Sequence, residues 1–195
     1  LLLECLSARA PIESLLDVGA HYSVSNDYAN VVRKIAKRYD GIDILNDSEA
    51  SLVLDNFYVA NAVGFDYPLK KYEVVVCIST IEHAGVSTYK RDNIKEEQNK
   101  LFKQCLELTE KYLWISFPVG QQYVYPGELS IITETQLSGW EELVKPFKTR
   151  QRFFYNQGPQ AGHPWYEHAK REAALRVPYV DFVGNQSICL MEVEI

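Results

Sequence analysis

The 195-residue chain has the size of one ordinary domain, and its 47% hydrophobic and 24% charged residues exclude a disordered or fibrous protein. The net charge is −6, and no stretch concentrates Lys and Arg, which argues against a nucleic-acid partner. We therefore expect one domain over residues 1–195 that acts on a small molecule.

The four cysteines are scattered, with no C-x-x-C pair, and three of them stand among apolar residues. Structural zinc needs closely spaced ligands and a secreted disulfide framework needs denser cysteine, so we expect no metal site and a cytoplasmic protein with free thiols. The opening run of leucines meets Glu4 at once and is too short to span a membrane.

Short apolar runs alternate with helical patterns along the first half of the chain. Residues 14–19 predict a strand that enters a turn at its glycine. Apolar residues at helical spacing from 28 to 39 predict a helix, and residues 41–45 and 57–60 predict a second and a third strand.

The strongest strand signal lies at residues 72–78, whose apolar run is typical of a central parallel strand covered on both faces. Residues 93–112 predict a long helix, and 112–117 a fifth strand. In the last third, the segment 133–136 resembles a capping box that opens a helix.

Two late strands, near residues 152–155 and 187–193, have only a short helical stretch at 167–175 between them. Parallel neighbours need crossovers, so the alternation predicts an α/β fold. We expect a doubly wound, Rossmann-like, seven-stranded and mostly parallel sheet with an antiparallel edge hairpin.

Ligands of such sheets bind beyond the carboxyl ends of the central strands. Gly19 follows the first strand, where a missing Cβ lets the backbone approach a ligand closely. Asp43 lies late in the second strand and can accept both hydrogen bonds of a ribose diol. Asn61 follows the third strand, where its amide can read an adenine edge, and residues 78–83 bring polar groups off the central strand.

Together these segments resemble the class I S-adenosylmethionine-dependent methyltransferases, in order and spacing, over about residues 14 to 120. The segments that resemble the family's first to fifth motifs are, in turn, Leu16–Ala20, Gly41–Asp43, Val59–Ala62, Lys71–His83 and Trp114–Gly120. The fourth is similar to the motif of small-molecule members, which ends in Glu-His. Asn61 stands where the family usually has Asp.

The resemblance implies S-adenosylmethionine as the cofactor. The residues it assigns to the cofactor are Asp17, Gly19, Ala20, His21, Tyr22, Asp43, Ile44, Asn61, Ala62 and Ser79. His21 departs from the family, whose first motif normally has a second glycine there. An imidazole at that position would crowd the cofactor's amino-acid tail unless the loop swings outward.

The resemblance also implies methyl transfer to an acceptor held in line. A hydroxyl acceptor must lose a proton, and His83 is the candidate base because imidazole takes up a proton near neutral pH. Glu82 is expected to orient His83 or to bind the acceptor, unless both residues only begin a helix and hold the loop. The fourth motif resembles that of methyltransferases of sugars and polysaccharides, so we expect a small-molecule or sugar hydroxyl.

Other readings stay open. His21 and Asn61 favour a catalytically degenerate module of the same fold, which binds a partner or acts as a scaffold. A nicotinamide-dependent oxidoreductase lacks support, because no G-x-G-x-x-G follows the first strand. Further candidates for the acceptor pocket are Tyr123, Tyr125 and Trp140, for each of which packing in the core or on the surface is the default. A loop with His163 can cover the pocket, and Trp165 and Tyr166 offer a stacking surface there.

Overall fold

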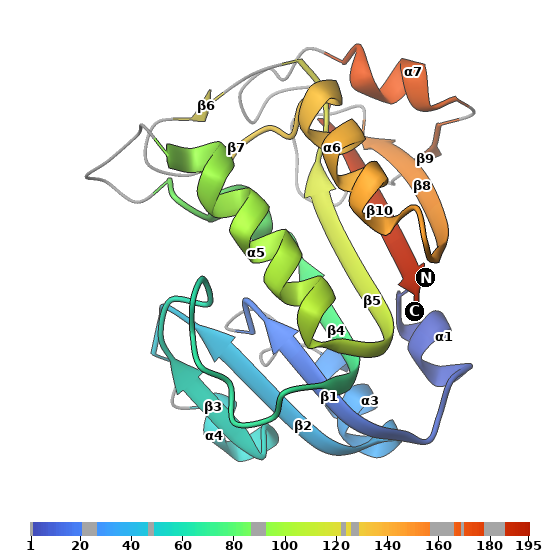
Figure 1. Ribbon diagram of the computed structural model, residues 1–195. Helices are drawn as coiled ribbons and strands as arrows, with labels where there is room; N and C mark the ends of the chain where they lie inside the picture. Colours follow the sequence, from blue (N-terminus) through green and yellow to red (C-terminus); the bar gives the residue numbers. More distant parts are fainter. Residues whose placement is uncertain are drawn as a thin grey trace.

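An eight-stranded sheet forms the centre of the molecule, and helices cover both of its faces (Figure 1). The structure is a computed structural model, and it describes residues 2–20, 27–46, 49–86, 93–121, 124–125, 129–156, 166–168, 170–177 and 186–195. The strands of the sheet are β1 (Ile12–Val18), β2 (Ala36–Asp43), β3 (Asn56–Val59), β4 (Tyr72–Ile78), β5 (Thr109–Pro118), β8 (Lys148–Asn156), β9 (Tyr166–Glu167) and β10 (Gln186–Glu194).

The strands lie in the order β3-β2-β1-β4-β5-β10-β8-β9. The five from β3 to β5 pair in parallel, whereas β10 runs antiparallel between β5 and β8. The predicted Rossmann-like, mostly parallel sheet with an antiparallel edge is therefore confirmed. It has eight strands rather than seven, because Tyr166–Glu167 pairs with β8 as a short edge strand. A separate hairpin joins β6 (Val124–Tyr125) and β7 (Leu129–Ser130).

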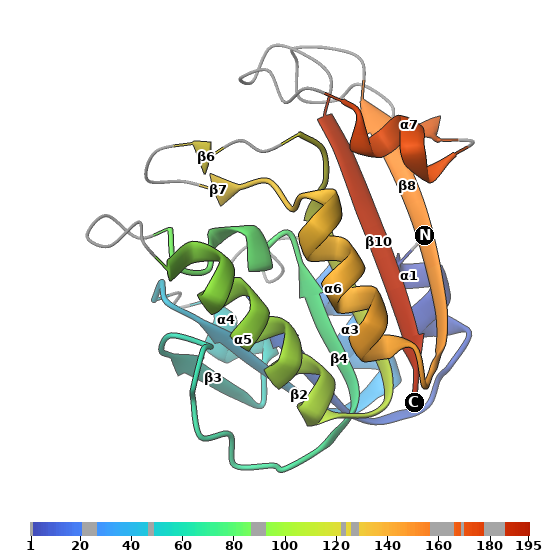
Figure 2. The same ribbon diagram turned by 45° about the horizontal axis from the view of Figure 1, so that its top comes forward.

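The sheet divides the apolar core into two layers, each covered by helices (Figure 2). One face of the sheet packs against α5 (Ile94–Leu108) and α6 (Glu134–Val144), and the opposite face against α1 (Leu2–Ser7) and α3 (Asp27–Ile35). The shorter helices are α4 (Ala50–Val53), α7 (Arg171–Leu175) and the 3₁₀ turn η1 (Ile81–His83). No helix in the described part of the chain is long and apolar enough to cross a membrane.

Several predicted boundaries are wrong at helix–strand junctions. The helix of residues 27–35 ends before Ala36, and Tyr39, predicted as helical, lies inside β2. Its ring is fully buried, so the apolar spacing that suggested another helical turn instead reflects inward positions of a strand. Similarly, β5 begins at Thr109 rather than at Tyr112, and the Thr109 hydroxyl donates to the carbonyl of Cys105 at the end of α5.

Two predictions in the last third are also corrected. Thr133 is the N-cap of α6 but makes no side-chain cap hydrogen bond, and the Gln136 side chain donates to Gln98 of α5 instead. The predicted capping box does not form. The helix expected from residue 167 begins at Arg171, because Glu167 belongs to β9 and pairs with Arg152 of β8.

A buried carboxylate ties the parallel strands together. Asp40 of β2 is fully buried and accepts hydrogen bonds from Tyr72 of β4 at 2.9 Å and Asn56 of β3 at 2.8 Å. Arg38 supplies the opposite charge at 2.8 Å. Buried charges are tolerated where partners satisfy them in this way, so Asp40 helps to fix the register of three strands.

We expect Tyr72→Phe to lower the free energy of unfolding by about 1–2 kcal/mol, because Asp40 loses a buried hydrogen bond to a charged group. Urea denaturation measures the change. Tyr112→Phe is the control, since the Tyr112 hydroxyl makes no hydrogen bond within the described residues and its removal should change stability little. Equal losses in the two variants would contradict the assigned role of the Tyr72 hydroxyl.

Candidate functional site

The carboxyl ends of β1, β2 and β3 meet at one rim of the sheet, where their arrowheads lie together in Figure 1. The amides of Gly19 and Ala20 both donate to the carbonyl of Ile42, at 2.8 and 3.2 Å. The amide of Ala60 donates to the carbonyl of Asp43 at 2.9 Å. Backbone hydrogen bonds thus join the turn after β1 to the end of β2 and the end of β2 to the end of β3. They bring together candidate site residues from three separate segments of the sequence.

The turns after β1 and β4 are packed against each other. Gly19 has a φ of +85°, and a Cβ built on it would stand 1.9 Å from Oγ1 of Thr80. Only glycine tolerates both that conformation and that contact. Ser79 has a positive φ of 49°, and its amide donates to the carbonyl of Ser116 in β5. The rim is therefore a fixed backbone frame rather than a set of independent loops.

Asp17, predicted to contact the cofactor, points into the interior. Its side chain is 2% exposed, and it accepts a hydrogen bond from the Tyr39 hydroxyl at 3.0 Å. Burial is the larger cause, and the negative charge of Asp17 the smaller one, of a raised pKa of the Tyr39 hydroxyl. The hydroxyl therefore keeps its proton and stays a donor. In this position Asp17 holds the end of β1 against β2 and supports the Gly19 turn from beneath.

The end of β2 combines a carboxylate with exposed apolar side chains. One oxygen of Asp43 accepts a hydrogen bond from the amide of Leu45 at 2.8 Å. The next side chain, Ile44, is 67% exposed, and Leu45 is 48% exposed. At the adjoining end of β3, Asn61 folds back to accept from the amide of Val63, and the side chain stays at the surface. Ile44 and Leu45 thus present apolar surface beside the Asp43 carboxylate.

Glu82 and His83 follow β4 in η1 and have opposite environments. Glu82 is 4% exposed, and its Oε2 has no hydrogen-bond partner among the described residues. Burial raises the pKa of this carboxyl to about 8. His83 is exposed at the same rim. The described contacts contain no hydrogen bond from Glu82 to His83, so the structure does not bring them together as an orienting pair.

Glu82 is held by a chain of amides that the sequence did not reveal. The side chain of Gln98 in α5 is fully buried and donates to the Glu82 carbonyl at 3.3 Å. Gln136 of α6 in turn donates to Gln98 at 2.9 Å. These positions look like ordinary helical glutamines in the sequence, and no local pattern distinguishes them. Through them, η1 is tied to both helices on this face of the sheet.

We expect Glu82→Gln to remove a pH dependence of folding. The raised pKa means that folded Glu82 keeps its proton between its ordinary value of 4.5 and about 8, so stability is greatest below 4.5 and falls as pH rises through 8. The loss is at most about 1.4 kcal/mol per pH unit in that window. Thermal denaturation from pH 5 to 9 should show a flatter profile for Glu82→Gln. Parallel profiles would contradict this, and Glu96→Gln on the exposed side of α5 is the control.

The structure tests some of the remaining predicted positions. Trp140 is 1% exposed and stacks on Phe102 with ring centroids 4.6 Å apart, so the default of core packing is confirmed for it and the acceptor pocket is not. Tyr166 lies in the edge strand β9, where its ring packs on Tyr155. The predicted positions outside the described residues are His21, Tyr22, Tyr123, His163 and Trp165, and only the backbone of Tyr125 is described. Within the described part, no three His, Cys, Asp or Glu side chains gather as a metal site.

The strand order, the antiparallel β10 and the glycine turn after β1 define the fold of class I S-adenosylmethionine-dependent methyltransferases. The chain is similar to magnesium protoporphyrin IX methyltransferase from Synechocystis PCC 6803, a structure with bound S-adenosylmethionine, at 15% identity and a TM-score of 0.58, over 100% of this chain and 76% of that one. It also matches a putative methyltransferase from Bacillus halodurans C-125, at 10% identity and a TM-score of 0.61, over 98% and 97% of the two chains.

A third similar structure is an S-adenosylmethionine-dependent methyltransferase from Archaeoglobus fulgidus, at 14% identity and a TM-score of 0.57, over 99% of this chain and 94% of that one. Neither the comparison with protein-family models nor the search of curated proteins finds a match. At these identities the likeness establishes the fold, and the fold by itself does not fix the activity.

The described residues at the rim fit an adenosyl group. Asp43 can accept hydrogen bonds from a ribose diol, and the exposed Ile44 side chain can cover one face of an adenine ring. The amide nitrogen of Asn61 is free to donate to a base edge, because its oxygen is the atom used in the turn. The Gly19 backbone lies beside these groups and has no side chain to obstruct a ligand.

Proposed function

We propose that the chain is an S-adenosylmethionine-dependent methyltransferase whose acceptor is a hydroxyl of a small molecule or a sugar. The observation that carries the proposal is the joining of the Gly19 turn to the end of β2, which sets Asp43 and the exposed Ile44 beside the glycine at one rim. Asp43 binds the ribose diol, Ile44 packs on the adenine, and Asn61 with Ala62 borders the base. Ser79 and Thr80 line the rim where the cofactor meets the acceptor.

S-adenosylmethionine supplies an electrophilic methyl group on a sulfonium, which leaves as a neutral thioether. The task of this chain is then to hold the acceptor oxygen in line with that methyl group and to exclude water. Exposed in η1 after β4, His83 takes the proton of the acceptor hydroxyl. The Gln98 side chain donates to the main-chain carbonyl of Glu82, which anchors η1 beneath His83, while the Glu82 side chain stays buried.

The experiment that tests the proposal has two arms. Isothermal titration measures binding of S-adenosylmethionine and S-adenosylhomocysteine to the purified chain. In the second arm, S-adenosylmethionine with a ¹³C-labelled methyl group is offered with a panel of monosaccharides, nucleotide sugars and phenols, and the methylated product is sought by NMR. We expect binding of both cofactor forms and a methyl ether product. Absence of cofactor binding would overturn the proposal in favour of a scaffold with the same fold.

A further inference from the structure

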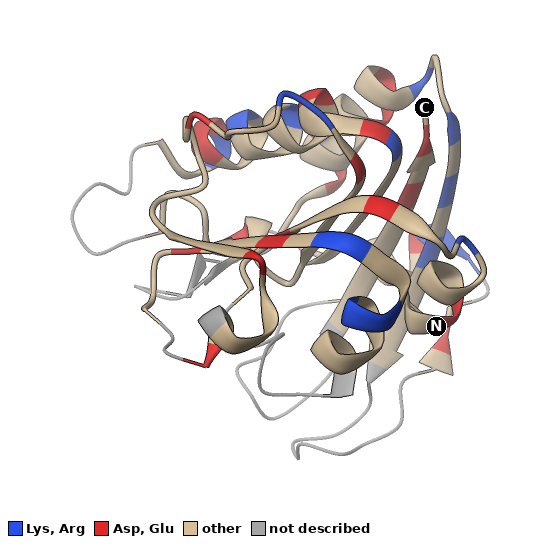
Figure 3. Cartoon of the chain, turned by 90° about the horizontal axis from the view of Figure 1, so that it is seen from below, with Lys and Arg blue, Asp and Glu red and all other residues tan. Residues whose placement is uncertain are grey.

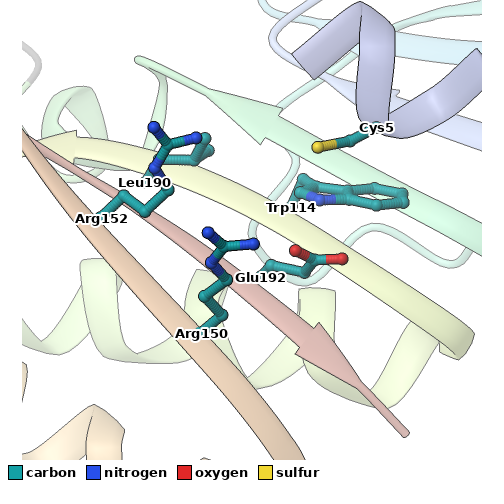
Figure 4. Close-up of a pocket in the computed structure, with 6 residues that line it drawn as sticks. All are labelled: Cys5, Trp114, Arg150, Arg152, Leu190 and Glu192. Atoms are coloured by element: carbon teal, nitrogen blue, oxygen red, sulfur yellow. The ribbon is translucent and has the colours of Figure 1, made fainter. Parts of the chain in front are cut away.

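Glu82 differs from the other buried carboxyl groups of the described residues, because one of its oxygens, Oε2, has no hydrogen-bond partner among them. By contrast, the shielded Glu73 is paired with Lys111 at 2.9 Å. Figure 4 shows the Glu192 carboxylate beside the guanidinium of Arg150, and Figure 3 shows acidic and basic positions interspersed along the chain. A buried carboxyl that is left out of such pairing is costly to ionise.

The amide cluster that holds η1 suits a neutral Glu82. Gln98 donates to the main-chain carbonyl of Glu82 at 3.3 Å, and Gln136 donates to the side-chain oxygen of Gln98 at 2.9 Å. The buried atom of this cluster that lacks a partner is Oε1 of Gln136, which is an acceptor. An acceptor does not stabilise a carboxylate, so the cluster gives no compensation for a charge on Glu82.

The other elements around η1 bring no cation to Glu82 within the described residues. η1 follows β4 and packs against α5, β5 and β7. Burial raises the pKa of Glu82 to about 8 and its own amide lowers it, with no contribution from a charged side chain. The titratable or charged groups near η1 are His83 in η1, Cys77 of β4, and Cys105, Glu97 and Lys100 of α5, whereas β7 has none and those of β5 lie at its opposite end.

Thr80 links η1 to the rim. Its carbonyl accepts from the amide of His83 at 3.0 Å, so it is part of the η1 turn. Its hydroxyl donates to the carbonyl of Ile78 at the end of β4, and its side chain packs directly against Gly19. A displacement of η1 therefore moves Thr80 away from the glycine turn that forms the centre of the rim.

We propose that η1 and Thr80 form a proton-controlled latch of the rim. While Glu82 holds its proton, η1 stays packed and Thr80 supports the Gly19 turn. When Glu82 releases its proton to solvent, its carboxylate becomes hydrated as η1 swings outward, and Thr80 then leaves the turn. The latch is a property of the described fold, so it does not depend on the methyltransferase proposal, and it acts on any ligand that binds at the rim.

The direction of the pH dependence follows from the two states of the latch. In the open state Glu82 is in water and has its ordinary pKa of 4.5, whereas in the closed state its pKa is about 8. Between these values opening releases one proton, so the open population rises by about tenfold per pH unit and levels off above pH 8. Acid closes the latch and alkali opens it.

Amide hydrogen exchange of the ¹⁵N-labelled full chain, followed by NMR from pH 5 to 9, tests the latch. The amides of Ala84 and Val86 report on η1, and the amide of Gly19 reports on the rim. After correction for the intrinsic exchange rate, the protection of all three should fall by about tenfold per pH unit between pH 5.5 and 7.5. The amide of Ala60, at the end of β3, should show no such slope.

Glu82→Gln keeps the shape of the side chain and removes its proton, so the protection of η1 and of Gly19 should become independent of pH. Glu97→Gln is the matched control, because the same change is made in a carboxyl that packs beside Gly85, next to η1, but is paired with Lys100. This variant should keep the slope of the unaltered protein.

Three results would overturn the latch, and the first two need no variant. Equal protection of the η1 amides and of the amides of the central strand β4 at every pH would mean that η1 opens only when the whole domain unfolds. A slope at Ala84 and Val86 without one at Gly19 would separate η1 from the rim. A slope that persists in Glu82→Gln would assign the proton to another group.

Discussion

Replacement of Asp43 by alanine is expected to weaken S-adenosylmethionine binding about 100-fold, because two hydrogen bonds from a ribose diol to a charged acceptor are lost. Isothermal titration with S-adenosylmethionine and S-adenosylhomocysteine measures the effect. Both ligands carry the same ribose, so both affinities should fall by a similar factor. The substitution does not change the acceptor side of the site. At saturating S-adenosylmethionine the rate of methyl transfer should therefore equal that of the unaltered protein.

Asp43→Asn separates the charge from the local structure. The asparagine oxygen can still accept from the Leu45 amide, so the turn after β2 is preserved. Affinity should fall by less than in Asp43→Ala, because one neutral acceptor remains. Asp66→Asn, at an exposed loop carboxylate paired with Lys70, controls for the change in net charge. An unchanged affinity in Asp43→Ala would remove Asp43 from the cofactor site.

The central part of the fold could be predicted because local and global signals agree there. The run from Val74 to Ile78 is buried along most of its length in the structure, as a strand between two helical layers must be. Gly19 and Asp43 could be placed at one rim because the carboxyl ends of neighbouring parallel strands always meet at the same edge. These inferences needed only the order of the strands along the chain and the expectation that neighbouring strands are parallel.

Prediction failed where one spacing of apolar residues is compatible with both a helix and a strand. The spacing from Ile35 to Tyr39 fits one more helical turn, but it also fits the inward side of a strand, and burial of Tyr39 against Asp17 decides for the strand. The same ambiguity misplaced the start of β5. For Trp140 both a core position and a pocket position stayed open, because an aromatic side chain suits either, and only its stacking on Phe102 distinguishes the two.

Long-range neighbours explain what the sequence could not show about the sites. Glu82 was expected to act with His83, yet its burial depends on packing beneath helices that begin more than ten residues further along the chain. Trp114, Arg150 and Leu190 also come to lie side by side, which follows only from the placement of β10 between β5 and β8. A sequence predicts that late strands exist more readily than it predicts their order in the sheet.

Substitution of His83 by glutamine is expected to slow methyl transfer at least about 100-fold, because the hydroxyl proton loses its acceptor in the transition state. Single-turnover transfer from ¹³C-labelled S-adenosylmethionine, with the acceptor found in the panel, measures the rate. Cofactor affinity should not change, since His83 lies in η1, beyond β4, and Asp43 ends β2. The combination of a lower rate and an unchanged dissociation constant distinguishes a base from a residue that only shapes the rim.

His168→Gln is the matched control for that experiment. His168 is the other described histidine, and it bonds Ser187 at 2.9 Å, on the antiparallel side of the sheet. The same chemical change there should leave the transfer rate near that of the unaltered protein. If His83→Gln retains the full rate with a hydroxyl acceptor, proton removal belongs to water or to another group. His83 would then be a surface residue of η1, and the acceptor would be sought among nucleophiles that need no base.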